Sequence, residues 1–65
     1  MEQIILKDKF NKVVIKRSSR SCGYIASTYT IWGEYVGCKH LYTKQELNDY
    51  IEFETTYGKM ERVEQ

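Results

Sequence analysis

Short hydrophobic segments of strand length, separated by polar residues, follow one another along the N-terminal part of the chain. Residues 3–7 and 12–17 are rich in Ile, Leu and Val, which favours two strands separated by a short polar turn. The strongest strand pattern lies at residues 24–31, where β-branched and aromatic residues alternate between two faces. After a tight turn at Trp32–Glu34, residues 35–42 are predicted to return as a further strand.

A helix is predicted to begin at Thr43, directly after the strand predicted at residues 35–42. Thr43 and Glu46 form the capping-box sequence Thr-x-x-Glu, in which each side chain accepts a hydrogen bond from the backbone of the other residue. The helix is expected to end at about residue 56, because Gly58 is a typical helix stop. One side of this helix carries its apolar residues, which are Leu47, Tyr50 and Ile51.

These elements predict an α+β fold, in which one C-terminal helix packs on one face of a small antiparallel sheet of three or four strands, β-β-β-(β)-α. Residues 1–58 are expected to form a single globular binding domain, and residues 59–65 a charged, frayed tail. Nothing in the predicted fold covers the second face of the sheet, so we expect a function there. The face of residues 24–31 expected to be more buried carries Ile25, Ser27, Tyr29 and Ile31.

The composition narrows the class of protein. The chain has 65 residues, of which 42% are hydrophobic and 14% aromatic, as in a small globular domain with one core. Its N-terminus does not resemble a signal peptide, and no apolar run approaches the roughly 20 residues of a membrane span. We therefore expect no membrane association and a bacterial cytoplasmic location. The absence of proline and the abundance of Lys, Glu, Ile and Tyr, which have AT-rich codons, suggest a low-GC bacterium, phage or plasmid as the origin.

Aromatic and acidic residues form the first group of candidate binding residues. Four aromatic residues are expected to fill the core, namely Phe10, Tyr29, Tyr50 and Phe53. One helix cannot cover all nine aromatic side chains, and exposed Tyr and Trp residues often anchor protein interfaces. The residues predicted to bind a protein partner are Trp32, Tyr24 and Tyr35 from the sheet and Glu46, Asp49 and Glu52 from the helix.

Basic residues form the second group. Residues 1–40 carry seven basic and three acidic side chains (+4), whereas residues 41–65 carry three basic and six acidic ones (−3). Cations and hydroxyl groups on one strand and its loop suit phosphate oxygens, although lysines also protect sheet edges against aggregation. The candidate nucleic-acid contacts are Lys12, Lys16, Arg17, Arg20 and Lys39.

Metal and catalytic sites are not predicted. Cys22, Cys38 and His40 are metal-ligating residue types, but a structural zinc site normally has four ligands and a cysteine knuckle. His40 is the single histidine, so acid–base catalysis would depend on it alone. We expect both cysteines to be thiols, with a disulfide between them as the less favoured alternative, and we expect no cofactor and no enzymatic activity.

Two functions from different classes remain as predictions. The first is a non-enzymatic protein-binding module, an accessory or inhibitory protein of a bacterium, phage or plasmid, such as an inhibitor of a host nucleic-acid-processing or defence enzyme. The second is DNA binding by the sheet, because three strands followed by a helix over residues 12–55 resemble, in element order, the arm-type DNA-binding domains of tyrosine-family integrases. A homodimer formed through the open sheet is compatible with either function.

Overall fold

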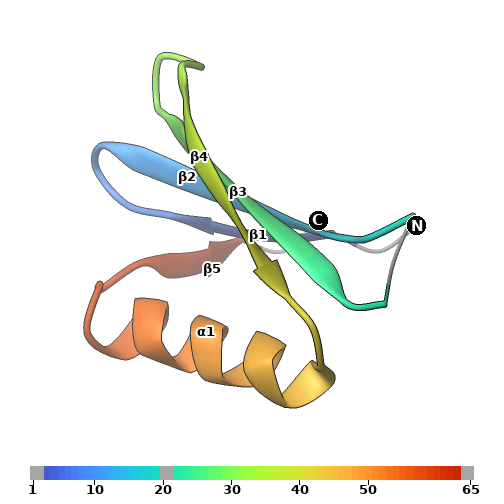
Figure 1. The fold of residues 1–65 in the computed structure, drawn as a ribbon. Coiled ribbons are helices and arrows are strands. Elements are labelled where there is room, and N and C mark those ends of the chain that lie inside the picture. Colours follow the sequence, from blue (N-terminus) through green and yellow to red (C-terminus); the bar gives the residue numbers. More distant parts are fainter. Residues whose placement is uncertain (1–2, 20–21, 64–65) are drawn as a thin grey trace.

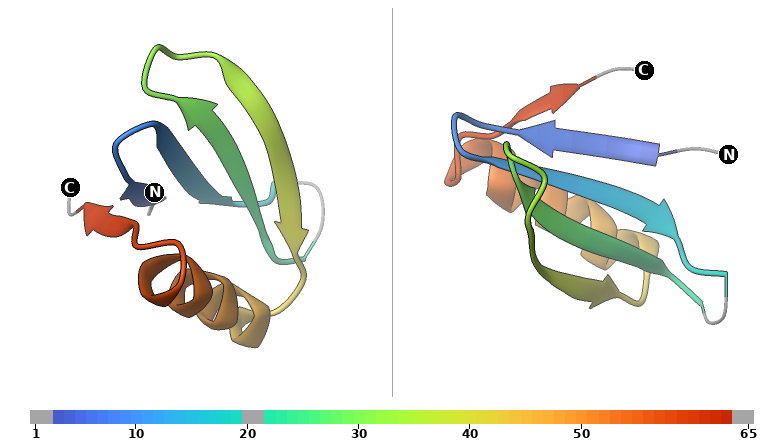
Figure 2. Two further views of the ribbon diagram at one scale, coloured as in Figure 1. Left: turned by 90° about the vertical axis from the view of Figure 1, so that its left-hand side faces the viewer. Right: turned by 90° about the horizontal axis from the view of Figure 1, so that it is seen from above.

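The computed structural model describes residues 3–19 and 22–63 and confirms the α+β fold (Figure 1). Its elements are β1 (Gln3–Lys7), β2 (Asn11–Arg17), β3 (Tyr24–Thr30), β4 (Tyr35–Leu41), α1 (Lys44–Thr56) and β5 (Glu61–Val63). The five strands form one antiparallel sheet in the order β4-β3-β2-β1-β5. Figure 2 shows that α1 lies against one face of the twisted sheet and leaves the other face bare.

The fifth strand differs from the frayed tail expected at residues 59–65. Glu61–Val63 pairs with β1, and the preceding Met60 is buried in the core. Lys59 adopts a positive φ of 56° between the helix and this strand, which turns the chain back toward the sheet. The domain therefore extends through Val63, while residues 64–65 lie outside the described residues.

The core lies between the sheet and the helix and is aliphatic. Its buried residues are Leu6, Val13, Ile15, Ala26, Leu41, Leu47 and Met60. The prediction for the faces of β3 is wrong, because Ala26 is 1% exposed whereas Ile25 on the opposite face is 36% exposed. Alternation shows that a strand has two faces but does not show which one meets the helix, and Ala26 takes little room where the layers pack.

Two of the four aromatic residues expected in the core are on the surface. Phe10 is 63% exposed in the β1–β2 turn, and Phe53 is 57% exposed on α1. Tyr50 does pack against the core, whereas Tyr29 is half-buried on the bare face of the sheet. The aliphatic side chains fill the space under the helix, so a domain of this size has no room for additional rings there.

One half of the predicted capping box is confirmed at the start of α1, whereas in the other half Glu46 reaches the amide of Tyr42 instead of that of Thr43. The Thr43 hydroxyl accepts a hydrogen bond from the Glu46 amide at 3.1 Å, and the Glu46 carboxylate accepts one from the Tyr42 amide at 2.7 Å. The first contact satisfies an amide that the first helical turn leaves unpaired, and the second ties the residue before the N-cap to that turn. The sharp start of the helix fixes its N-terminal end beside the end of β4.

Candidate binding surfaces

The bare side of the sheet, here called the open face, carries three rows of side chains set by the strand register. The first row is Glu61, Lys7, Lys12, Tyr29 and Tyr35. The second row is Val63, Ile5, Val14, Ser27 and Cys38. The third row is Gln3, Lys16, Ile25 and His40. An apolar and small-residue floor therefore lies between two rows that carry cations.

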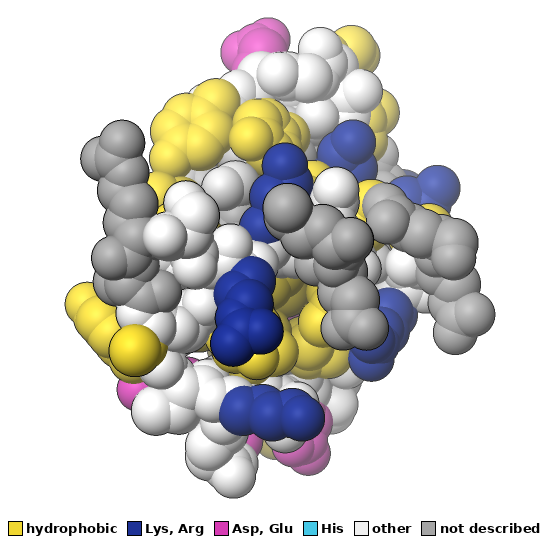
Figure 3. All heavy atoms as spheres, turned by 90° about the vertical axis from the view of Figure 1, so that its right-hand side faces the viewer, with side chains coloured by type: hydrophobic (Ala, Val, Ile, Leu, Met, Phe, Trp, Pro, Cys, Tyr) yellow, Lys and Arg dark blue, Asp and Glu magenta, His cyan; other side chains and the backbone are white. Residues whose placement is uncertain are grey.

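Lysine side chains border two shallow depressions on the open face. One has a volume of about 510 Å³, with Lys12 and Lys16 on its rim and Val14 on its floor. The other, of about 310 Å³, is lined by Lys7 and Lys12 together with Tyr29. In the view of Figure 3, Lys and Arg side chains are spread among hydrophobic ones, with acidic side chains near the periphery.

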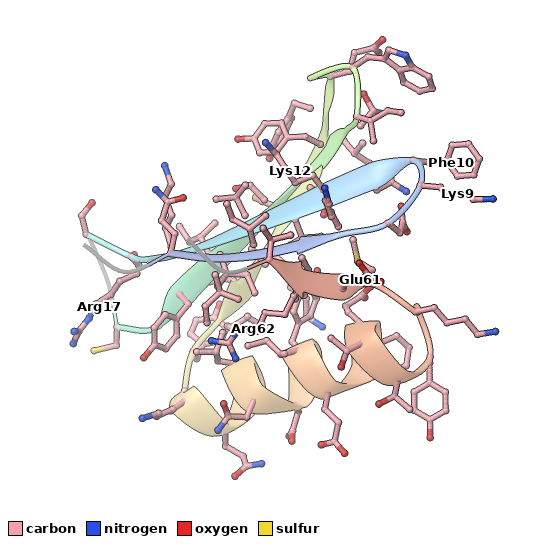
Figure 4. All side chains as sticks on the ribbon, turned by 180° about the vertical axis from the view of Figure 1, so that it is seen from behind. Lys9, Phe10, Lys12, Arg17, Glu61 and Arg62 are labelled. Carbon is pink, nitrogen blue, oxygen red and sulfur yellow. The ribbon has the colours of Figure 1, made fainter. Side chains whose placement is uncertain are left out.

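The structure brings together only part of the predicted basic set. Lys12 and Lys16 share the open face with Lys7, a residue outside the predicted set, and Arg17 lies at the far end of β2 from the β1–β2 turn (Figure 4). Lys39 was expected to join them, which is wrong: it lies opposite Ala26 on the helix side. The remaining candidate, Arg20, lies outside the described residues.

Exposed hydrophobic residues gather at the end of the sheet where the β1–β2 and β3–β4 turns lie. We call this set the aromatic tip, and it comprises Phe10, Ile31, Trp32, Tyr35 and Val36. The Ile31 amide donates a hydrogen bond to the Phe10 carbonyl at 3.0 Å, which joins the two turns. Trp32 is 71% exposed, and Phe10 projects outward from its turn (Figure 4).

Backbone geometry holds the tip in place. Gly33 has a φ of +90° in the β3–β4 turn, a conformation that glycine adopts readily. Two backbone hydrogen bonds close this turn: the Gly33 amide donates to the Thr30 carbonyl at 2.9 Å, and the Thr30 amide donates to the Glu34 carbonyl at 2.8 Å. A β-bulge follows, because Thr28 pairs with Gly37 but Tyr29 pairs with Tyr35.

Tyr29 and Tyr35 connect the tip to the open face. Their rings pack edge to face with centroids 5.7 Å apart. A side-chain hydrogen bond with Cys38 raises the pKa of Tyr35 above its usual value. Trp32 and Tyr35, both predicted to bind a protein, therefore lie at the same end of the molecule.

A third surface lies between the edge strand β4 and the helix, and we call it the β4–α1 groove. Its volume is about 640 Å³, and it is lined by Lys39, His40, Leu41, Tyr42, Glu46, Asp49, Tyr50, Phe53 and Glu54. The Lys39 ammonium lies 5.8 Å from the Tyr50 ring centroid, within reach of a cation–π interaction. Burial, and then the nearby Glu54 carboxylate, raise the pKa of Tyr50.

The predicted protein-binding residues divide among these surfaces. Glu46 and Asp49 line the β4–α1 groove, whereas Glu52 is exposed on α1 and does not line it. Tyr24 is half-buried and packs against the core on the helix side, away from the open face. The sequence-predicted set is therefore not a single patch.

The thiols and the histidine are not gathered into a metal-binding group. Cys22 and Cys38 are exposed free cysteines, and no three His, Cys, Asp or Glu side chains cluster within residues 3–19 and 22–63. His40 stacks on Tyr42 with ring centroids 4.2 Å apart, and its Nε2 lies 3.1 Å from the Cys22 carbonyl oxygen. These contacts place the His40 ring between Tyr42 and the Cys22 carbonyl near the end of β4.

Comparison with protein-family models, curated proteins and solved structures finds no significant match to this chain. Among the described residues, no helix has the length and apolar character needed to cross a membrane. The basis for a functional proposal is therefore the chain's own surfaces.

Proposed function

We propose that the chain is a small non-enzymatic protein-binding module that contacts its partner through the aromatic tip and the adjoining edge of the sheet. The observation that carries this proposal is the grouping of Phe10, Ile31, Trp32, Tyr35 and Val36, all exposed, at one end of the sheet. Large apolar side chains gathered on a small domain favour an interface.

The tip has the properties of an interface anchor. Trp32 and Tyr35 offer large contact areas, and both side chains lose little conformational freedom on binding. The hydrogen bond between Ile31 and Phe10 and the closed β3–β4 turn organise the backbone before any partner arrives. The free-energy cost of ordering the interface on binding is therefore lower.

The proposed role is that of an accessory or inhibitory protein of bacterial, phage or plasmid origin that acts in the cytoplasm of a bacterium. Its acidic helix, with Asp49 and Glu52 exposed, suits a target with a basic surface, such as a nucleic-acid-processing or defence enzyme. The carboxylates would then occupy the place of nucleic-acid phosphates on that enzyme.

Affinity capture from the cells that encode the chain tests this proposal, with nuclease treatment to remove bridging nucleic acid. We expect a protein that is captured by the wild type and lost with the Trp32→Ala, Tyr35→Ala double variant. The matched control is Tyr57→Ala, which removes a ring that is 74% exposed directly after α1 and that belongs to neither the aromatic tip nor the β4–α1 groove. Equal capture by the wild type and the tip variant would rule out the tip as the interface.

DNA binding through the open face is the second candidate, favoured by the grouping of Lys7, Lys12 and Lys16 beside the two depressions. The integrase-like order of β2, β3, β4 and α1 is present, although β1 and β5 extend the sheet. Lysines neutralise phosphates and release counterions, so binding would weaken steeply as salt increases. A gel shift at low salt tests it: the Lys12→Glu, Lys16→Glu variant should lose a shift that the wild type shows, and no wild-type shift even at about 50 mM salt eliminates this candidate.

A further inference from the structure

We infer that the outer edge of β4, together with the β4–α1 groove, is a docking site for an extended, positively charged segment of a partner protein. This inference rests on the proposed protein-binding function and specifies the chemistry of the partner. The segment adds to β4 as a further antiparallel or parallel strand, and its basic side chains on the helix side enter the groove.

Unpaired backbone along β4 is the first support. The described sheet ends at β4, which pairs with β3 on one side only. Outward N–H and C=O groups of an edge strand pair readily with an added strand. β4 has seven residues and no proline, whereas β5 at the other edge has three. Because the bulge distorts the start of β4, the regular docking edge is the segment 37–41.

Side-chain alternation directs the added strand toward the groove. Gly37, Lys39 and Leu41 share the helix side of β4, opposite Thr28, Ala26 and Tyr24. Every second side chain of an added strand takes that same side and lies over the groove. No atom outside its own chain neighbours lies within 4 Å of where a Cβ would stand on Gly37, so an arriving side chain finds room there.

The charge of the groove selects a basic segment. Three carboxylates, those of Glu46, Asp49 and Glu54, line it against the single ammonium of Lys39. The chain itself already places that ammonium near the Tyr50 ring, at 5.8 Å from its centroid. Two further rings, Tyr42 and Phe53, are exposed in the groove and offer faces for arginine side chains.

The same features define the sequence that the site accepts. Nucleic acid is disfavoured because its phosphates would face the carboxylates of Asp49 and Glu54. A protein segment with Lys or Arg at every second position places its cations on the helix side and its other side chains beside Cys38 and His40. The expected partner motif is therefore alternating basic and small polar residues in an extended segment.

A synthetic peptide of seven residues, the length of β4, tests this site: Arg at alternate positions and Thr between them. We expect NMR amide shifts of the isotope-labelled chain to change at Gly37–Leu41 and on the groove side of α1, and not at Lys7 or Lys12. A peptide with Glu in place of Arg is expected not to bind. No shift changes with the arginine peptide at millimolar concentration, or changes confined to the open face, would overturn the inference.

Methylation of the peptide's backbone amides distinguishes binding by strand addition to β4 from binding by charge attraction alone. Two further peptides carry N-methyl groups on the Arg amides or on the Thr amides, because only one of these sets can face β4. One of the two should bind about tenfold more weakly than the parent peptide, and the other should bind normally. If both methylated peptides bind as tightly as the parent peptide, or if neither binds, the peptide does not pair with β4 along one edge.

Variants locate the groove and separate this inference from the proposed function. Asp49→Lys with Glu54→Lys should weaken binding of the arginine peptide at least about tenfold, while the control Asn48→Lys, at an exposed position of α1 outside the groove, should not. Glu46 is left unchanged because it caps α1. If the native partner is lost with the tip variant but kept by the groove variant, the groove inference fails and the protein-binding function stands.

Discussion

Lys7 and Lys12 lie directly opposite each other on β1 and β2, and both side chains are exposed on the open face. Like charges at directly opposed positions destabilise a sheet. Glu61 pairs with Lys7 from the other side and offsets part of this repulsion. The repulsion between Lys7 and Lys12 thus lowers the stability of the fold at the surface proposed as the second candidate binding site. Binding residues often have such a destabilising effect.

Lys12→Glu should therefore raise the free energy of unfolding by about 0.5 kcal/mol, because it converts the repulsion with Lys7 into an attraction. Urea denaturation at low and high salt measures the change, which salt should reduce. The matched control is Lys16→Glu, since Lys16 lies opposite the uncharged Gln3. An equal effect of both substitutions would show that net charge, and not the opposed pair, is responsible.

Met60→Ala should lower the free energy of unfolding by about 2–5 kcal/mol, the range for large-to-small changes at buried positions. Met60 is one of the seven buried residues of the core cluster and immediately precedes β5. Chemical denaturation measures the loss, and Tyr57→Ala, at an exposed position nearby, serves as the control. Equal stability of the Met60 variant and the wild type would mean that the C-terminal segment does not pack in solution.

Two glycines with positive φ should respond differently to alanine. Gly23→Ala combines a φ of +99° with a clash, because the new Cβ would overlap the Leu41 carbonyl oxygen and lie 2.9 Å from Tyr42 Cα. Gly33→Ala has a φ of +90° but meets nothing within 4 Å, so only the conformational cost of about 1–2 kcal/mol applies. Thermal unfolding of the two variants should rank Gly23→Ala as clearly less stable, and the reverse order would contradict the close approach of Gly23 to the end of β4.

High pH should destabilise the fold through Tyr50. Its pKa is raised in the folded state by burial and by the Glu54 carboxylate, so the folded state holds the phenolic proton more tightly than the unfolded state. Stability from this group is complete below the unfolded pKa of about 10 and is lost as pH rises toward the higher folded value. Tyr50→Phe should flatten that part of the pH–stability curve, and ultraviolet titration should show one fewer late-ionising tyrosine. Identical curves for variant and wild type would exclude Tyr50 as the cause.

Local signals predicted much of the fold. The capping box at Thr43 fixed the start of α1 because its hydrogen bonds involve neighbouring residues alone. The strand at Glu61–Val63 was missed because it is short and charged, and because its partner β1 is distant in sequence. A solitary apolar residue such as Met60 carries no periodicity, so no pattern indicated its burial.

The binding surfaces were predicted in part. Exposure of Trp32 and Tyr35 followed from an excess of aromatic residues over the space under one helix. Phe10 was placed in the core, although Asp8 accepts hydrogen bonds from the Phe10 and Asn11 amides at 2.8 and 2.7 Å in a tight turn. The turn chemistry of Asp8 could have indicated an exposed ring, and hairpin symmetry around the turn could have placed Lys7 opposite Lys12.

The position of β1 between β2 and β5 has a kinetic consequence. A nascent chain can form the β1–β2 hairpin early, but one margin of β1 stays without hydrogen-bond partners until residues 61–63 have left the ribosome. Until then Leu6 is not fully buried, because Met60, which belongs to the same core cluster, has not yet packed. The sheet is therefore completed only after the residues that follow α1 have been translated. A product truncated before β5 would expose the unpaired edge of β1, which favours aggregation with other chains.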